Sequence, residues 1–124
     1  METAQITLST SNHSEYPPEA AIDNDEKTFY VSTGTFPQVF IITFASKTNV
    51  QRILLQSTNI RELSIEYRAD ATGDWQTLYE NTLDDTKGQF QNENKKVTCT
   101  TKALKVIIKS GYAEFVSIHK FSIS

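Results

Sequence analysis

Apolar and polar residues alternate with a period of two through most of this sequence. Leu104, Val106 and Ile108, for example, are separated by lysine and isoleucine. Successive side chains of a β-strand point to opposite faces, so this pattern predicts strands with one buried face. The helical period of 3.6 is almost absent, and the only predicted helix is a single turn at Pro18–Ile22. The sequence therefore predicts an all-β chain.

Polar turns separate the segments that carry this alternation. The predicted strands are residues 5–9, 39–44, 50–57, 62–68, 75–80, 97–101, 104–109 and 116–121. Short strands at this spacing indicate an antiparallel β-sandwich or a barrel, and 124 residues suit a single domain, residues 1–124. Two connections, Ser11–Tyr30 and Asn81–Asn94, are long for a compact domain, so functional residues are expected there and at the Ser110–Phe115 turn.

Charge and cysteine content narrow the classes of function. The net charge is −3, which gives no general attraction to nucleic acid or to anionic membranes. Cys99 is the only cysteine, and a lone thiol suits a reducing compartment. The N-terminus shows no secretory signal, and no apolar run is long enough to span a membrane. We expect a soluble intracellular protein.

The sequence contains few of the residue patterns that catalytic sites use. Its histidines, His13 and His119, lie in a polar loop and in the last predicted strand, and no nucleophile elbow, phosphate-binding glycine loop or Cys-x-x-Cys pair is present. Asp84 and Asp85 lie in a polar connection, where solvated carboxylates are common. Cys99 lies within a strand and is expected to be a small packed residue. We therefore expect no catalytic activity.

One loop has the oxygen-rich composition that hard cations prefer. Asp23, Asp25 and Thr28 supply side-chain oxygens within six residues. The loop is not an EF-hand, because Lys27 and Thr28 replace an oxygen ligand and the required glycine. Spacing alone leaves two interpretations open: a calcium site, or a turn in which the acidic side chains hydrogen-bond to nearby backbone.

Four segments carry a resemblance to a known family. The run Tyr16–Tyr30 is similar to the opening of discoidin-type, galactose-binding-like domains. Gly34–Phe44, Gly88–Glu93 and Ser110–Ser122 narrow the match, and together the segments resemble the intraflagellar transport subunit twenty-five family of small heat-shock-like proteins. Tyr30 departs from the family, because tryptophan is usual at that position.

The resemblance implies a jelly-roll β-sandwich with no activity of its own. It implies a heterodimer with a Rab-like small GTPase subunit, assembly into the B complex of intraflagellar transport, and location in the cytoplasm and in the cilium or flagellum. It also implies a Ca²⁺ site. By position, the matching ligands are Ala20, through its backbone carbonyl, Asp23, Asp25, Thr28 and Ser117.

Other residues leave alternatives open. Tyr112 and Phe115 are either exposed anchors for a partner or part of a packed turn. Lys105 and Lys109 share a strand face that is either merely solvated or a contact for the GTPase. The alternative function is that of a discoidin-like carbohydrate- or surface-binding module. That function would need an aromatic platform, and Trp75 is the only tryptophan.

Overall fold

The computed structural model describes residues 4–9, 30–31, 36–70, 73–113 and 115–124, and within residues 4–9 it describes only the Ile6 side chain. The strands in these ranges are β1 (Ala4–Ser9), β2 (Tyr30–Val31), β3 (Gln38–Thr58), β4 (Ile60–Arg68), β5 (Gln76–Thr82), β6 (Gln91–Gly111) and β7 (Ser117–Ile123). All pairings between them are antiparallel. The predicted all-β class is confirmed. No helix among the described residues is long and apolar enough to cross a membrane.

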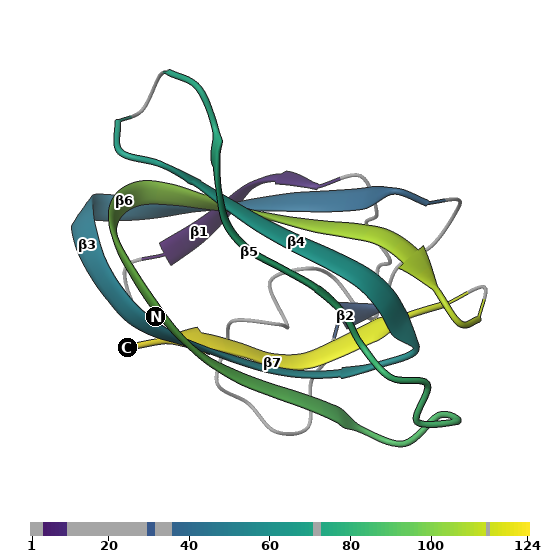
Figure 1. The fold of residues 1–124 in the computed structure, drawn as a ribbon. Helices are drawn as coiled ribbons and strands as arrows, with labels where there is room; N and C mark the ends of the chain where they lie inside the picture. Colours follow the sequence, from purple (N-terminus) through teal and green to yellow (C-terminus); the bar gives the residue numbers. More distant parts are fainter. Residues whose placement is uncertain (1–3, 10–29, 32–35, 71–72, 114) are drawn as a thin grey trace.

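The strands form two facing layers (Figure 1). The upper layer contains β1, the first part of β3, the second part of β6, β4 and β5, and the lower layer contains β2, β7, the second part of β3 and the first part of β6. β3 and β6 run through both layers and bend together at one side of the molecule (Figure 1). The arrangement is an antiparallel β-sandwich, as predicted.

The shared bend has a local cause in the pairing of β3 with β6. The register shifts between Thr43, which pairs with Ala103, and Thr48, which pairs with Thr101. Ala45, Ser46 and Lys47, which lie in this interval of β3, are exposed, whereas the Thr101 side chain is buried. Its hydroxyl accepts a hydrogen bond from the backbone N–H of Ala103 and lies 2.8 Å from the carbonyl oxygen of Arg68. A buried side chain therefore satisfies backbone groups where the ladder is interrupted.

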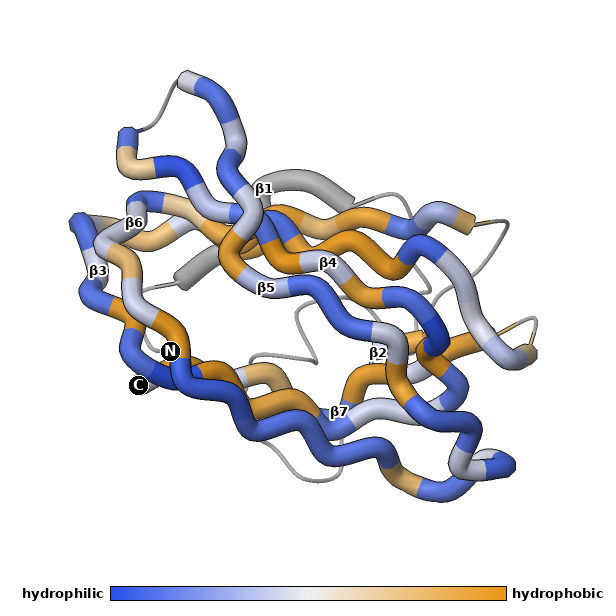
Figure 2. The backbone as a smooth tube through the Cα atoms, in the orientation of Figure 1, coloured by the Kyte–Doolittle hydropathy of each residue, from blue (hydrophilic) through white to orange (hydrophobic). Residues whose placement is uncertain are grey.

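Apolar side chains of both layers meet in one core. Phe40, Ile42 and Phe44 of β3 are buried, and the intervening residues are half-buried, as the alternation predicts. Tyr30 of β2 is fully buried and lies edge-on to Phe40, with 5.5 Å between ring centroids. Tyrosine thus fills the interior position at which tryptophan is usual in the resembled family. Figure 2 shows that apolar residues recur along strands of both layers.

Three predictions of where strands begin and end are wrong. Segments 39–44 and 50–57 belong to one strand, β3, and 97–101 and 104–109 belong to another, β6, because a bent strand and two strands joined by a turn give similar alternation. The predicted connection Asn81–Asn94 is shorter, since β5 continues to Thr82 and β6 begins at Gln91. Residues 91–96 carry no apolar side chain and therefore gave no strand signal. The predicted helical turn, Pro18–Ile22, lies outside the described residues.

Candidate binding surface at the Asn59 end

One end of the sandwich is organised around the tight turn between β3 and β4. Asn59 occupies that turn with φ of 62°, a left-handed conformation that asparagine adopts more readily than most residues. Its carbonyl oxygen accepts a hydrogen bond from the backbone N–H of Tyr112, 2.8 Å away, in the β6–β7 turn. We call the β3–β4 turn, the connection 83–90 with Gln91, and the β6–β7 turn with the adjoining residues 117–119 the Asn59 end.

Gln91 ties the connection 83–90 to this turn. Its side chain is 4% exposed, and its Oε1 accepts hydrogen bonds from the Ser57 hydroxyl and the Ile60 N–H, both at 3.0 Å. Its Nε2 donates to the carbonyl oxygens of Ile60 and Asp84, at 2.7 and 3.0 Å. All four hydrogen-bonding positions of the amide are therefore used, as burial requires.

Gly111 lets the β6–β7 turn approach the β3–β4 turn closely. A Cβ atom at this position would lie 2.8 Å from Cγ1 of Val116, 2.9 Å from Cζ of Phe36 and 3.0 Å from the carbonyl oxygen of Asn59. Real Cβ atoms almost never approach neighbours this closely. A side chain at residue 111 would therefore force these neighbours to shift.

Three aromatic side chains remain exposed at the Asn59 end. Phe90 is 50% exposed, Tyr112 39% and Phe115 55%. The Tyr112 hydroxyl donates to the carbonyl oxygen of Leu83 at 2.6 Å, and the Phe90 ring lies edge-on to the His119 ring, with 4.8 Å between centroids. The sequence indicated Tyr112 and Phe115 as candidates but missed Phe90. The packed-turn alternative is wrong for Phe115, which is more than half exposed.

Ser117 is the one predicted Ca²⁺ ligand that the structure describes. Its hydroxyl lies 2.5 Å from Oγ1 of Thr58 and 3.0 Å from Nε2 of His119. A hydroxyl offers one hydrogen and two lone pairs, so these two bonds leave it capacity for one further interaction. Ala20, Asp23, Asp25 and Thr28 lie outside the described residues. Within the described ranges, no three acidic, histidine or cysteine side chains gather as metal ligands would.

The Ser117–His119 contact is not arranged as an exposed catalytic pair. Ser117 is 9% exposed, and its hydroxyl also bonds to Thr58, so a substrate would have little access to it. Partial burial lowers the pKa of His119. Burial raises the pKa of the Cys99 thiol, which makes it a weak nucleophile and agrees with the packed role predicted for it.

The lysines of the upper layer are held in ion pairs. Nζ of Lys105 lies 3.6 Å from the Glu66 carboxylate, and Nζ of Lys109 lies 3.8 Å from that of Glu80. Both lysines point away from the buried residues of β6, as the alternation predicts. These pairs are the ordinary arrangement of a solvated sheet face.

Comparison with solved structures identifies the fold. A family 32 carbohydrate-binding module of Clostridium perfringens, solved with GalNAc-β-1,3-galactose, aligns over 98% of this chain and 95% of its own, with TM-score 0.81 and 17% identity. The C-terminal domain of a Bacteroides fragilis chitobiase aligns over 98% and 93%, with TM-score 0.82 and 18% identity. Residues 5–121 match the F5/8 type C domain family. The chain therefore has the discoidin-like fold.

Comparison with proteins of similar sequence identifies a narrower family. The human intraflagellar transport protein 25 homolog is 35% identical over 123 residues, covering 98% of this chain and 85% of that protein. The chain belongs to the intraflagellar transport protein 25 family. Intraflagellar transport protein 25 of Chlamydomonas reinhardtii is 29% identical over 119 residues, which cover 95% of this chain and 63% of that protein.

Three of the four sequence segments that resemble this family contribute residues to the Asn59 end. Gly34–Phe44 supplies Phe36, Gly88–Glu93 supplies Gln91, and Ser110–Ser122 supplies Gly111 and Tyr112. Each of these residues touches or hydrogen-bonds to the β3–β4 turn or to a residue packed on it. Residues from three segments that are separate in sequence thus lie together at the Asn59 end.

Proposed function

We propose that this chain is a non-catalytic subunit of the intraflagellar transport B complex, acting in the cytoplasm and in the cilium or flagellum. The main support for this proposal is the 35% identity with the human intraflagellar transport protein 25 homolog over nearly the whole chain. The buried Ser117 hydroxyl and the weakly nucleophilic Cys99 thiol agree with a binding role rather than a catalytic one.

The partner in this proposal is a Rab-like small GTPase subunit, and the Asn59 end is its contact surface. Phe90, Tyr112 and Phe115 are the large apolar side chains that stand exposed among the described residues. Aromatic side chains dominate the binding energy of many interfaces because they bury large area with few rotatable bonds. The hydrogen bonds of Gln91 and Tyr112 hold the loops that carry these rings, which lowers the entropy lost on binding.

The alternative, a carbohydrate-binding module, has less support from the side chains. The Trp75 ring is covered by cations: Cζ of Arg68 lies 4.4 Å and Nζ of Lys105 lies 4.8 Å from its centroid. A sugar stacks on an open aromatic face, and this ring already carries cation–π contacts. The likeness to carbohydrate-binding modules, at 17–18% identity, concerns the fold alone.

Mixing the chain with a Rab-like intraflagellar transport GTPase on a sizing column tests the proposal. We expect one peak with one copy of each protein, and we expect Phe90→Ser/Phe115→Ser to weaken the complex strongly. Gln76→Ser/Thr77→Ala, on the exposed part of β5, is the matched control and should leave the complex intact. Separate elution of the unaltered proteins at micromolar concentration would contradict the partner. A complex insensitive to the aromatic substitutions would contradict the surface.

We also propose that the chain binds Ca²⁺ through the Ala20 carbonyl, Asp23, Asp25, Thr28 and Ser117. Carboxylate, hydroxyl and carbonyl oxygens are the ligands that this ion prefers. The remaining capacity of the Ser117 hydroxyl is compatible with such a role. When bound, the ion would link the Asp23–Thr28 segment to the start of β7.

A further inference from the structure

Among the described residues, the part of the lower layer's outer face where β3, β6 and β7 lie side by side carries mainly polar and cationic side chains, with Leu54 as its apolar member. Period-two alternation places Arg52, Leu54 and Gln56 on the face of β3 opposite the buried Ile53 and Leu55. Their cross-strand partners on β6 are Lys96, Asn94 and Asn92, and those of Leu54 and Gln56 on β7 are Ser122 and Lys120. We call these eight residues the amide–cation face.

Side-chain hydrogen bonds confirm that these residues share a face. Nη1 of Arg52 donates to Oδ1 of Asn94, and Nε2 of Gln56 lies 3.5 Å from Oδ1 of Asn92. The members on β6 are exposed, Lys120 is exposed, and the members on β3 are half-buried. Figure 2 shows this stretch of β6 as a continuous hydrophilic strand at the surface of the lower layer.

No carboxylate balances the cations of this face within the described part of the chain. The ion pairs of the described residues, Lys47–Asp70, Lys105–Glu66 and Lys109–Glu80, all involve other lysines. Glu93, the acidic residue nearest in sequence to Lys96, accepts hydrogen bonds from the Tyr79 hydroxyl and Asn81 Nδ2 on β5. Its charge is therefore directed toward the opposite layer.

Arg52 and Lys96 are moreover direct cross-strand partners. Like charges placed opposite each other in an antiparallel pair are unfavourable. This like-charge pair therefore lowers the stability of the free chain. The net charge of the whole protein is −3, so the cations of this face do not simply follow from the composition.

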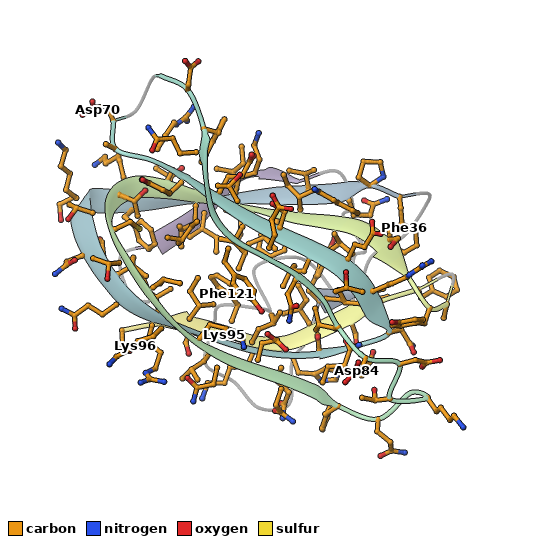
Figure 3. The ribbon with its side chains drawn as sticks, viewed as in Figure 1. Phe36, Asp70, Asp84, Lys95, Lys96 and Phe121 are labelled. Atoms are coloured by element: carbon orange, nitrogen blue, oxygen red, sulfur yellow. The ribbon has the colours of Figure 1, made fainter. Side chains whose placement is uncertain are left out.

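Protection of a sheet edge explains only part of this pattern. The first part of β6 pairs with β3 alone, and Lys95 and Lys96 on this edge are suited to discourage pairing with another chain (Figure 3). Arg52 has no such role, since it pairs with Lys96 of β6 on one side and hydrogen-bonds to the backbone of Ser124 on the other. The presence of a cation at this interior position needs a different explanation.

We propose that the amide–cation face binds an acidic segment of another protein. Carboxylates of such a segment would neutralise Arg52, Lys96 and Lys120 and accept hydrogen bonds from the Asn and Gln amides. The inference does not depend on the GTPase or on the Asn59 end, because it concerns different residues.

Binding of a fluorescein-labelled peptide of alternating glutamate and alanine to the full chain tests this proposal by fluorescence anisotropy. We expect binding at low salt that fades as salt rises from about 0.01 to about 1 M, which shortens the Debye length from about 30 to about 3 Å. Arg52→Gln/Lys96→Gln should weaken binding about tenfold. Lys47→Gln/Lys109→Gln removes the same charge elsewhere and should leave binding almost unchanged.

A second measurement separates loss of binding from loss of folding. Because Arg52→Gln/Lys96→Gln removes a like-charge pair, its melting temperature should equal or exceed that of the unaltered chain. The proposal is overturned if the two double variants weaken binding equally, or if an oligonucleotide or phosphatidylserine vesicles bind this face more tightly than the peptide. One further result would overturn it: Glu15→Gln/Glu19→Gln strengthens peptide binding as much as Arg52→Gln/Lys96→Gln weakens it. That result would mean that an acidic segment of this same chain occupies the face.

Discussion

The side-chain amide of Gln91 pairs with both backbone polar groups of Ile60, accepting from its N–H at 3.0 Å and donating to its carbonyl oxygen at 2.7 Å. A side chain thus takes the place of a neighbouring strand at the start of β4. The same amide also bonds to Ser57 and to the carbonyl of Asp84, so one residue fixes the β3–β4 turn and the connection 83–90 together.

Gln91→Ala should destabilise the fold by about 2–4 kcal/mol, because the Ile60 N–H and carbonyl would lose their partners in a buried place. Gln91→Glu should also be destabilising, since a carboxylate cannot donate to the carbonyls of Ile60 and Asp84. Urea unfolding measures both effects. Asn92→Ala, next along β6 and exposed, is the control and should stay within about 0.5 kcal/mol of the unaltered chain. Equal effects at the two positions would show that the amide bonds add nothing to stability.

Gly111→Ala should destabilise by about 1–3 kcal/mol through overpacking against Val116, Phe36 and the Asn59 carbonyl. A double-mutant cycle with Val116→Ala, read by chemical denaturation, tests the cause. Removing the Val116 methyls relieves one of the contacts, so the cost of Gly111→Ala should be smaller in that background. Strictly additive costs would argue against the steric explanation.

Tyr79 should contribute stability that is lost in alkali. Burial, followed by the hydrogen bond to Glu93 and the charge of Glu93, raises the pKa of Tyr79 well above its usual value. A group with a raised folded pKa stabilises fully below its unfolded pKa, about 10 for tyrosine, and loses that contribution as pH rises further. The stability difference between the unaltered chain and Tyr79→Phe should thus be constant near neutrality and shrink above about pH 10. Urea titrations over that range measure it, and a constant difference would contradict the assignment.

His119 should make stability sensitive to mild acid. Because burial lowers the pKa of His119, the unfolded chain binds this proton more readily than the folded one. Stability should therefore fall as pH drops below about 6.5, the unfolded pKa of histidine. His119→Gln should remove most of this slope between pH 5 and 7 in thermal melts, and His13→Gln serves as the comparison. If the slope survives His119→Gln unchanged, another group is responsible.

Calcium should raise the melting temperature if the proposed site forms. A ligand that binds only the folded state stabilises by RT ln(1 + [L]/Kd), about 2.7 kcal/mol at a hundredfold excess over Kd. Asp23→Ala should abolish the response, whereas Asp74→Ala, an exposed acid on the other layer, should not. Magnesium should act more weakly, because its octahedral shell suits a loop of carbonyls poorly. A melting curve unmoved by millimolar calcium would leave the acidic turn with a structural role only.

The sequence predicts the strands whose inner face is apolar and fails where the inner face is polar. Phe40, Ile42 and Phe44 alternate because their side chains face the core. Gln91 and Glu93 also point inward, but they satisfy Ile60, Tyr79 and Asn81 instead of filling the core, so their strand has no apolar period. A buried side-chain amide hydrogen-bonds to backbone groups that are brought near it by the pairing of distant strands. No local sequence pattern contains that information.

The candidate surface likewise contains some residues that the sequence indicates and others that it does not. Tyr112 and Phe115 stood out because they lie in a short turn between two strong strands, where few buried positions are available. Phe90 did not, since an aromatic residue within a polar connection gives the same pattern whether it packs or projects. The amide–cation face was also missed, because Arg52, Lys96 and Lys120 are far apart in sequence and come together only through the register of β3 with β6 and β7.

The passage of β3 and β6 through both layers bears on how the chain folds during synthesis. β3 leaves the ribosome well before its main partners, β6 and β7, and Arg52 and Gln51 also bond to the backbone of Ser124. Among the described strands, β1 with β3 and β4 with β5 are the pairs that form without β6 or β7. Neither layer can close before β6 and β7 have emerged, so the second part of β3, with the apolar Ile53 and Leu55, stays without a strand partner until then, and nascent-chain chaperones have a long interval in which to bind it.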